Sequence, residues 1–247
     1  AGVGAFGRRA LERARRLAEL GFAPPAHEVA DGFLVTTWVA GRPLSPGDAD
    51  GALLDRMGGY VAALAREFPS GETVDFDGMM EMVRVNVREG LGEAWEARTD
   101  GLERLRDAVA GRETVGVDGR MLPHEWIVTG DGYLKTDGVD HHDDHFFPGR
   151  QDAAWDLAGA IVEFELDDQA ARQLVDRYAA LSGDREVVHR MPFNLVAYLA
   201  YRLGYATLSA DSLGGAPDAA RLRALAGRYA ARLKREIEAA TRSPRVI

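Results

Sequence analysis

The sequence contains no cysteine in its 247 residues, which excludes disulfides, thiolate zinc sites and cysteine nucleophiles. This absence fits a reducing compartment, so we expect a cytoplasmic protein. No run of about eighteen apolar residues occurs, and we therefore expect no membrane-spanning helix. The opening stretch, "AGVGAFGRRALERARR", also lacks an apolar segment long enough for a signal peptide.

Lysine is almost absent: Lys135 and Lys234 are the only lysines, and the other basic residues counted with them are arginines. Thirty basic residues stand against 39 acidic ones, giving a formal net charge of −9. A basic nucleic-acid surface is therefore not expected as the main function. The sequence also has no phosphate-binding P-loop and no G-x-S-x-G nucleophile motif.

The hydrophobic content of 46% is enough for a sizeable core. Strand-like runs flank Asp31-Gly32 and the "TGDG" turn at 129–132, and these signals predict two hairpins. Most of the remaining chain repeats apolar residues at helical spacing. The predicted helices cover residues 6–20, 51–68, 76–95, 100–110, 152–166, 168–183, 191–210 and 218–242. Two hairpins among many helices indicate a mostly helical α+β fold.

The polar stretch 118–147 holds four of the six histidines. Glu125 and Asp137 lie on either side of its predicted hairpin, which would bring the two carboxylates together. Oxygen ligands of this kind suit Mg²⁺, which usually binds one or two carboxylates plus substrate phosphates. The pair is therefore a candidate magnesium site.

The run "DHHDDH" at 140–145 gives an alternative. Imidazole and carboxylate together are ligands for zinc, iron or nickel, and His141, His142 and His145 are the candidates for such a site. The spacing does not match a helix-mounted H-E-x-x-H motif. A solvated polar loop with capping aspartates is the other interpretation of the same residues.

Residues 118–128, "DGRMLPHEWIV", resemble the catalytic loop H-G-D-L-H-P-G-N-I-L-V of the aminoglycoside-phosphotransferase and choline-kinase branch of the protein-kinase-like fold. Gly119, Pro123 and the apolar pair 127–128 fall in register. "KTDG" places Asp137 where this family has a magnesium-binding Asp. "DAAWDLA" at 152–158 matches the family's G-D-P-A-Y-D-L-A, with Asp156 at the position of the buried Asp that braces the catalytic loop.

The resemblance implies a protein-kinase-like C-lobe with a partial N-lobe, whose first strands are expected to be absent from this chain. Residues 1–43 would be the N-lobe remnant, and residues 44–247 the helical C-lobe. "DGFLVTTWVAGRPL" resembles the strand and hinge that contact adenine, so Thr37, Trp38 and Val39 are implied nucleotide-binding residues. ATP and Mg²⁺ are the implied cofactors, with a transition metal as the alternative.

The sequence departs from the family pattern at two positions of the loop. Arg120 stands at the position of the catalytic Asp, and a guanidinium cannot accept a proton from a substrate hydroxyl. Glu125 stands where the family has an Asn that binds the second magnesium ion, and a glutamate could still bind Mg²⁺. The strand-borne lysine that grips the phosphates is not found, since neither lysine lies in the corresponding region.

Three functional hypotheses follow. The first is a degenerate kinase-like protein that binds a nucleotide, a divalent metal or a protein partner, with its base replaced by Arg120. The second is an active small-molecule phosphotransferase with an atypical loop, in which Asp118 or His124 substitutes for the base. The third is a metal-dependent enzyme or sensor that uses the "DHHDDH" loop.

Several of these residues also have purely structural interpretations. Asp156 could be a helix cap. Trp38, Trp126 and Trp155 are expected in the core, because large aromatic side chains bury most of their surface. The arginines of the first predicted helix, among them Arg13, are expected to line its solvated face.

Overall fold

The computed structural model describes residues 2–139 and 149–242. Its contacts divide the chain into two compact units, each formed from two separate segments. Unit 1 comprises Ala1–Ser70 and Val115–Asp184; unit 2 comprises Gly71–Thr114 and Arg185–Ile247. The two units are described separately below, and the lobe boundary expected between residues 43 and 44 stays a prediction.

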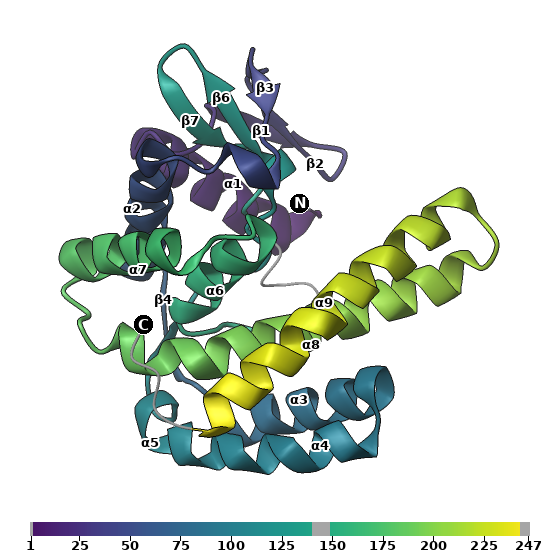
Figure 1. Ribbon diagram of the computed structural model, residues 1–247. Coiled ribbons are helices and arrows are strands. Elements are labelled where there is room, and N and C mark those ends of the chain that lie inside the picture. Colours follow the sequence, from purple (N-terminus) through teal and green to yellow (C-terminus); the bar gives the residue numbers. More distant parts are fainter. Residues whose placement is uncertain (1, 140–148, 243–247) are drawn as a thin grey trace. The chain divides into compact units, whose positions relative to one another are not determined.

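Unit 1 combines helices with five short strands (Figure 1). Its helices are α1 (Gly4–Glu19), α2 (Gly51–Glu67), α6 (Ala154–Glu163) and α7 (Asp168–Ser182), with the 3-10 turns η1 (Pro46–Asp48) and η3 (Pro123–Glu125). Its strands are β1 (Ala26–Ala30), β2 (Phe33–Thr36), β3 (Arg42–Pro43), β6 (Trp126–Thr129) and β7 (Gly132–Lys135).

Both predicted hairpins form. β1 pairs antiparallel with β2 around a turn in which Asp31 and Gly32 both have positive φ, as the Asp-Gly signal predicts. β6 pairs antiparallel with β7, and the short β3 adds to the free side of β6, giving the order β3-β6-β7. The strand β3 thus joins the segment after the first hairpin to the second hairpin.

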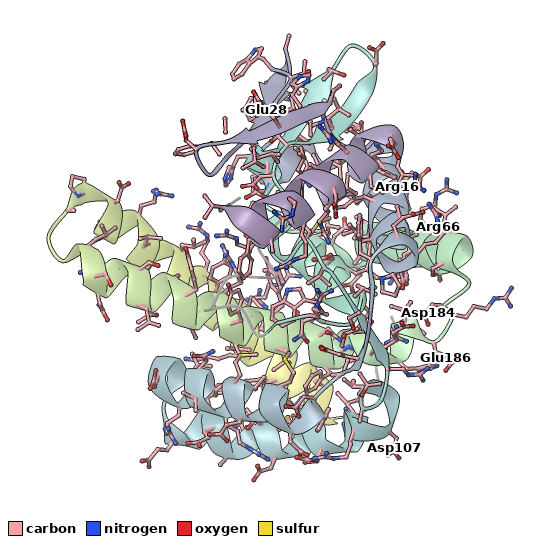
Figure 2. The ribbon with its side chains drawn as sticks, turned by 180° about the vertical axis from the view of Figure 1, so that it is seen from behind. Arg16, Glu28, Arg66, Asp107, Asp184 and Glu186 are labelled. Carbon is pink, nitrogen blue, oxygen red and sulfur yellow. The ribbon has the colours of Figure 1, made fainter. Side chains whose placement is uncertain are left out.

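The helices of unit 1 pack through apolar faces that the sequence spacing predicts. On α1 the buried set includes Ala10, Ala14 and Leu17, while α2 packs closely against α7. At the surface, Glu67 of α2 pairs with both Arg16 and Arg66, the two arginines labelled in Figure 2. Exposed pairs of this kind contribute only about 0–1 kcal/mol each, so the buried faces dominate the stability.

Unit 2 is helical. Its helices are α3 (Phe76–Leu91), α4 (Glu93–Thr99), α5 (Arg106–Val109), α8 (Val187–Leu213) and α9 (Pro217–Arg242), with the 3-10 segment η2 (Asp100–Leu105). The long helices α8 and α9 form an antiparallel hairpin, against which α3 packs through α8 (Figure 1). The strands β4 (Pro69–Thr73) and β5 (Glu113–Val115) pair where the chain passes between the units.

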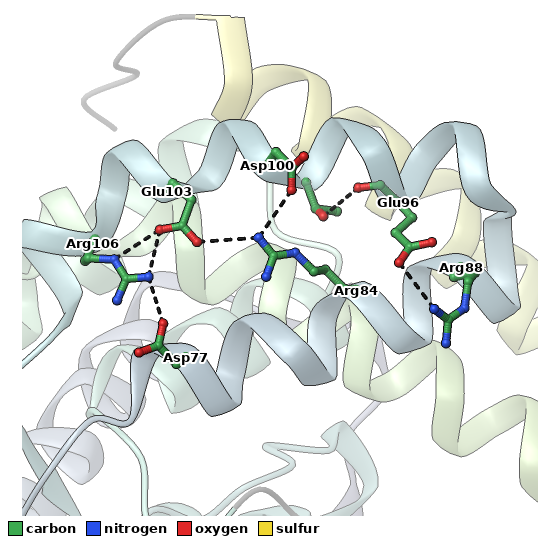
Figure 3. A network of polar contacts seen from close by, with 8 residues as sticks. Asp77, Arg84, Arg88, Glu96, Asp100, Glu103 and Arg106 are labelled. Atoms are coloured by element: carbon green, nitrogen blue, oxygen red, sulfur yellow. Dashed lines mark hydrogen bonds and ion pairs between the residues drawn. The ribbon is translucent and has the colours of Figure 1, made fainter.

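A chain of ion pairs joins α3 to the segments that follow it (Figure 3). Arg84 contacts Asp100 at 3.2 Å and Glu103 at 3.5 Å, while Arg106 contacts Glu103 and Asp77, both at 2.8 Å. These side chains are partly exposed to solvent, so each ion pair contributes little to stability, and the network only supports the packing of α3.

The mostly helical α+β fold is confirmed, and so are the buried positions of Trp126 and Trp155. The prediction for Trp38 is wrong, because its side chain is 90% exposed between β2 and β3. The prediction for Arg13 is also wrong, because this residue lies on the buried face of α1. Among the described residues, every helix is too short or too polar to span a lipid bilayer.

Candidate functional site

The loop 118–121 lies in unit 1 and is held by groups from α6. The Asp156 carboxylate accepts hydrogen bonds from the amides of Asp118 and Gly119, both at 2.8 Å. The indole Nε1 of Trp155 donates to the Gly119 carbonyl at 3.0 Å. Asp156 therefore does more than occupy the first turn of α6, since its two oxygens fix two consecutive peptides of the loop.

The Asp118 side chain secures the same loop from inside. Its Oδ1 accepts hydrogen bonds from the backbone amides of Arg120 and Met121, at 3.5 and 3.3 Å, while its Oδ2 accepts one from the Tyr60 hydroxyl at 2.8 Å. Gly119 has φ +99° and the buried Met121 has φ +43°, a region that side chains other than glycine rarely adopt. The surrounding bonds hold Met121 in this strained conformation.

A buried ion-pair cluster lies beside the loop. The Lys135 Nζ is 3.0 Å from Asp118 Oδ2 and 2.8 Å from Glu125 Oε2. The Lys135 and Asp118 side chains are essentially inaccessible to solvent, and that of Glu125 is 9% exposed. Charges in such surroundings persist only when they are paired, so these three residues form one unit.

Arg13 of α1 connects the two segments that flank this cluster. Its guanidinium donates to the carbonyls of Gly116, Val117 and Gly138, at 2.7, 3.1 and 3.0 Å. Gly138 approaches so closely that a Cβ there would lie 2.5 Å from both Asp118 Oδ2 and the Tyr60 hydroxyl. The segment after β7 is thus packed directly against the loop.

Burial and pairing shift the protonation equilibria of this cluster. Burial raises the pKa of Asp156 to about 7; the Asp118 charge acts in the same direction, and the two loop amides oppose it. Burial, followed by the Asp118 charge, holds the pKa of Tyr60 well above its usual range. For Lys135, burial opposes ionisation, but Asp118 and Glu125 outweigh it, so its pKa is raised and the ammonium stays charged.

Metal binding by the pair Glu125 and Asp137 stays a prediction. The backbone around it does converge, since the amide and hydroxyl of Thr136 both donate to the Glu125 carbonyl, at 2.8 and 2.9 Å. The Glu125 carboxylate, however, is turned to Lys135, whereas the Asp137 side chain is exposed. No group of three potential metal ligands occurs in the described part of the chain.

The other predicted site residues are distributed as follows. Arg120 is half-buried at the outer part of the loop, and His124 is exposed on η3. Thr37 is fixed through its amide to the Pro25 carbonyl and through its hydroxyl to His27 Nε2, at 2.8 and 2.9 Å. Trp38 and Val39 follow in the open connection before β3. His141, His142 and His145 lie outside the described residues.

Three members of the cluster were not predicted from the sequence as site residues: Arg13, Tyr60 and Lys135. The sequence does contain a signal that Lys135 is paired. It follows the apolar Leu134 in a short strand, and the preceding segment carries the acidic residues Asp118 and Glu125. Arg13 carries a similar signal, since it lies between Ala10, Ala14 and Leu17 on the apolar face of α1. Nothing local distinguishes Tyr60 from an ordinary core aromatic.

Comparison with solved structures places the fold among small-molecule kinases. Choline kinase LicA from Streptococcus pneumoniae matches with a TM-score of 0.63 at 14% identity, over 96% of this chain and 84% of that chain. A choline/ethanolamine kinase family protein from Mesorhizobium loti matches with 0.61 at 19%, over 98% and 86%. A glucosamine kinase in complex with glucosamine, ADP and inorganic phosphate matches with 0.63 at 16%, over 92% and 71%.

The chain therefore has the fold of these small-molecule kinases, as the loop and "DAAWDLA" resemblances imply. At these identities the likeness establishes the fold and leaves the activity open. No protein-family model matches the sequence, and no curated protein matches it either.

Proposed function

We propose that this chain is a degenerate kinase-like protein that binds a nucleotide and does not transfer its phosphoryl group. One observation supports the proposal: loop 118–121 is braced by Asp156, Trp155 and Asp118, and Arg120 of this loop stands where the resembling family has its base. A guanidinium stays protonated at any workable pH and cannot accept a proton from a substrate hydroxyl.

The ligand class follows from the fold and from the exposed connection after β2. LicA has been solved with AMP, and the glucosamine kinase with ADP, so this fold accommodates adenine nucleotides in those proteins. In this chain Thr37 is anchored by two hydrogen bonds, while the neighbouring Trp38 ring is 90% exposed. An exposed indole beside a fixed backbone suits stacking against a planar base.

An active phosphotransferase is the second candidate, and His124 is the observation that favours it. Asp118 cannot replace the missing base, because its carboxylate is fully buried and engaged by Tyr60, Lys135 and two loop amides. His124 is exposed four residues beyond Arg120, and an imidazole can act as a general base near neutral pH.

Trp38 provides the binding experiment. Trp126 and Trp155 are fully buried, whereas Trp95 of α4 is partly exposed. In a Trp95→Phe background, quenching of exposed tryptophan fluorescence by ATP or ADP therefore reports on the 37–39 segment. We expect saturable quenching that Trp38→Phe abolishes. Isothermal calorimetry on the same variant then separates loss of the reporter from loss of binding.

Turnover distinguishes the two candidate functions. We expect no ADP formation above background from ATP with a panel of amines and alcohols. Robust turnover that His124→Ala eliminates would establish the second candidate instead. If neither fluorescence nor calorimetry detects a nucleotide, the proposed binding function is wrong.

A further inference from the structure

The pairing of β1 with β2 is interrupted at His27. Ala26 lies opposite Thr36 and Glu28 lies opposite Val35, so the register shifts between them. His27 is therefore an additional residue on β1, as in a β-bulge. Bulges bend a strand and redirect a side chain, and they are common beside functional sites. The backbone of β1 thus draws attention to the direction of the His27 side chain.

The redirected imidazole contacts the segment that follows β2. His27 Nε2 lies 2.9 Å from the Thr37 hydroxyl, and the Thr37 amide donates to the Pro25 carbonyl at 2.8 Å. Two hydrogen bonds therefore hold the first residue of the 37–39 segment. The next residue, Trp38, is 90% exposed. Because its ring makes little contact with the rest of the protein, the direction of the ring depends mainly on the backbone of Thr37.

The same segment is also fixed at its far end. A Cβ at Gly41 would collide with the Val128 carbonyl and with the Ile127 side chain, so the backbone of Gly41 lies directly against β6. Residues 38–40 alone separate this contact from Thr37. A short connection held at both ends has few conformations, and release of either end should make the whole segment less ordered.

Arg15 of α1 contacts the bulge itself. Its guanidinium donates to the Ala26 carbonyl at 3.4 Å and to the His27 carbonyl, at the point where the register shifts. A bulge disrupts the ladder of backbone hydrogen bonds, and a charged donor compensates for this at the two carbonyls. Arg15, His27 and Thr37 therefore form a continuous series of contacts from α1 to the segment that carries Trp38.

From these contacts we propose that His27, held in the bulge by Arg15, is a positioning residue that sets the direction in which Trp38 presents its ring to a planar base. The inference rests on the proposed function, because it concerns the same 37–39 segment. His27 acts through the backbone of Thr37 and does not itself contact the ligand. The part of the ligand concerned is the base, so adenosine should depend on His27 as much as ATP does.

Calorimetry with ATP and with adenosine measures the effect of His27→Ala. Loss of one hydrogen bond to the segment should weaken the binding of both ligands by about threefold to tenfold. His27→Gln, whose amide can bond the same hydroxyl, should bind both ligands within about twofold of the native protein. His189→Ala, which changes an exposed histidine of α8, is the matched control and should alter neither affinity.

A Trp38→Ala background shows whether His27 acts through the indole. We expect His27→Ala to cause no further loss of ATP affinity in this background, because effects that pass through one side chain are not additive. Thr37→Val removes the other partner of the bond, and combining it with His27→Ala should weaken binding no more than either change alone. Exchange of the Thr37 amide, measured by NMR without ligand, should be about threefold to tenfold faster in His27→Ala.

The outcomes separate this inference from the proposed function. If Trp38→Ala weakens ATP binding by about fivefold or more while His27→Ala binds like the native protein, the positioning role is wrong and the binding function stands. An equal loss from His27→Ala with and without Trp38 would show that His27 acts by another route, which also overturns the inference. A lower melting temperature of His27→Ala with unchanged affinity would leave His27 only a structural role. Absence of ATP binding by the native protein overturns both proposals.

Discussion

Replacing Lys135 by methionine is the sharpest test of the buried cluster. Methionine has nearly the same length and can fill the same space, but it leaves the carboxylates of Asp118 and Glu125 without the ammonium that both contact within 3.0 Å. Removing one partner of a buried ion pair typically destabilises a protein by about 3–5 kcal/mol, because the remaining charge is left uncompensated. That is a large share of the roughly 5–15 kcal/mol that holds a domain together.

The chain provides its own control. Lys234 is the only other lysine, and it is exposed on α9, where it lies 5.5 Å from the Trp95 ring. Lys234→Met should therefore change the free energy of unfolding by no more than about 0.5–1 kcal/mol. Urea titrations followed by tryptophan fluorescence measure both variants, since Trp126 and Trp155 are buried in the same unit as Lys135.

For Lys135→Met we expect a fall of about 3–5 kcal/mol, which corresponds to a melting temperature lower by about 6–20 °C in a protein of this size. The triple variant that adds Asp118→Asn and Glu125→Gln has no net charge in the cluster and should recover much of the loss. Equal stabilities of Lys135→Met and Lys234→Met at pH 7 would refute the ion-pair interpretation.

Three further outcomes are expected. The pKa of Asp156 is raised from 3.8 to about 7, so the folded state binds this proton more tightly than the unfolded state does. The contribution of this group to the free energy of unfolding therefore falls as the pH rises from about 4 to 7. The free energy of unfolding of the native protein minus that of Asp156→Asn should fall over this window, and a pH-independent difference would contradict the shift. Acylation of amines in the folded protein, followed by peptide mapping, should modify Lys234 and spare Lys135, because Lys135 is buried until urea unfolds the protein. Rapid labelling of Lys135 in the folded protein would show instead that its amine is accessible. Gly138→Ala should lower the melting temperature by several degrees, because the new methyl group would lie 2.5 Å from a carboxylate oxygen of Asp118. A melting curve like that of the native protein would show that the segment around Gly138 can move away from Asp118.

Local sequence signals were sufficient for several elements of this fold. The Asp-Gly turn at 31–32 and the apolar spacing of α1 and α2 depend on neighbours within a few residues, and these elements formed within two residues of their expected ends. The helix predicted over 76–95 is divided instead into α3 and α4, and most of the segment predicted as helix over 100–110 is the 3-10 segment η2. The start of α8 was placed too late, at residue 191 instead of Val187, because Pro192 is accommodated inside the helix. Proline normally favours the first turn, which made a later start the natural expectation.

The candidate site was only partly predictable, because its key contacts join residues far apart in the chain. Asp156 could be placed through a motif, whereas Arg13 reaches carbonyl groups more than a hundred residues away. Arginine on a helix is usually solvated, so its residue type favoured the wrong face, although its spacing with Ala10, Ala14 and Leu17 indicated the buried one. Trp38 was misplaced for the opposite reason, since aromatic residues are usually buried and nothing local marks it as exposed.

Glu125 and Lys135 show why site residues must be interpreted together. Taken alone, a glutamate in place of a metal-binding asparagine adds a negative charge and favours a stronger magnesium site. Beside a buried lysine at 2.8 Å the same glutamate has its charge compensated within the protein, and a buried glutamate without such a partner would be strongly destabilising. The two residues thus compensate each other's charge, and we expect this pairing to compete with any metal for the Glu125 carboxylate.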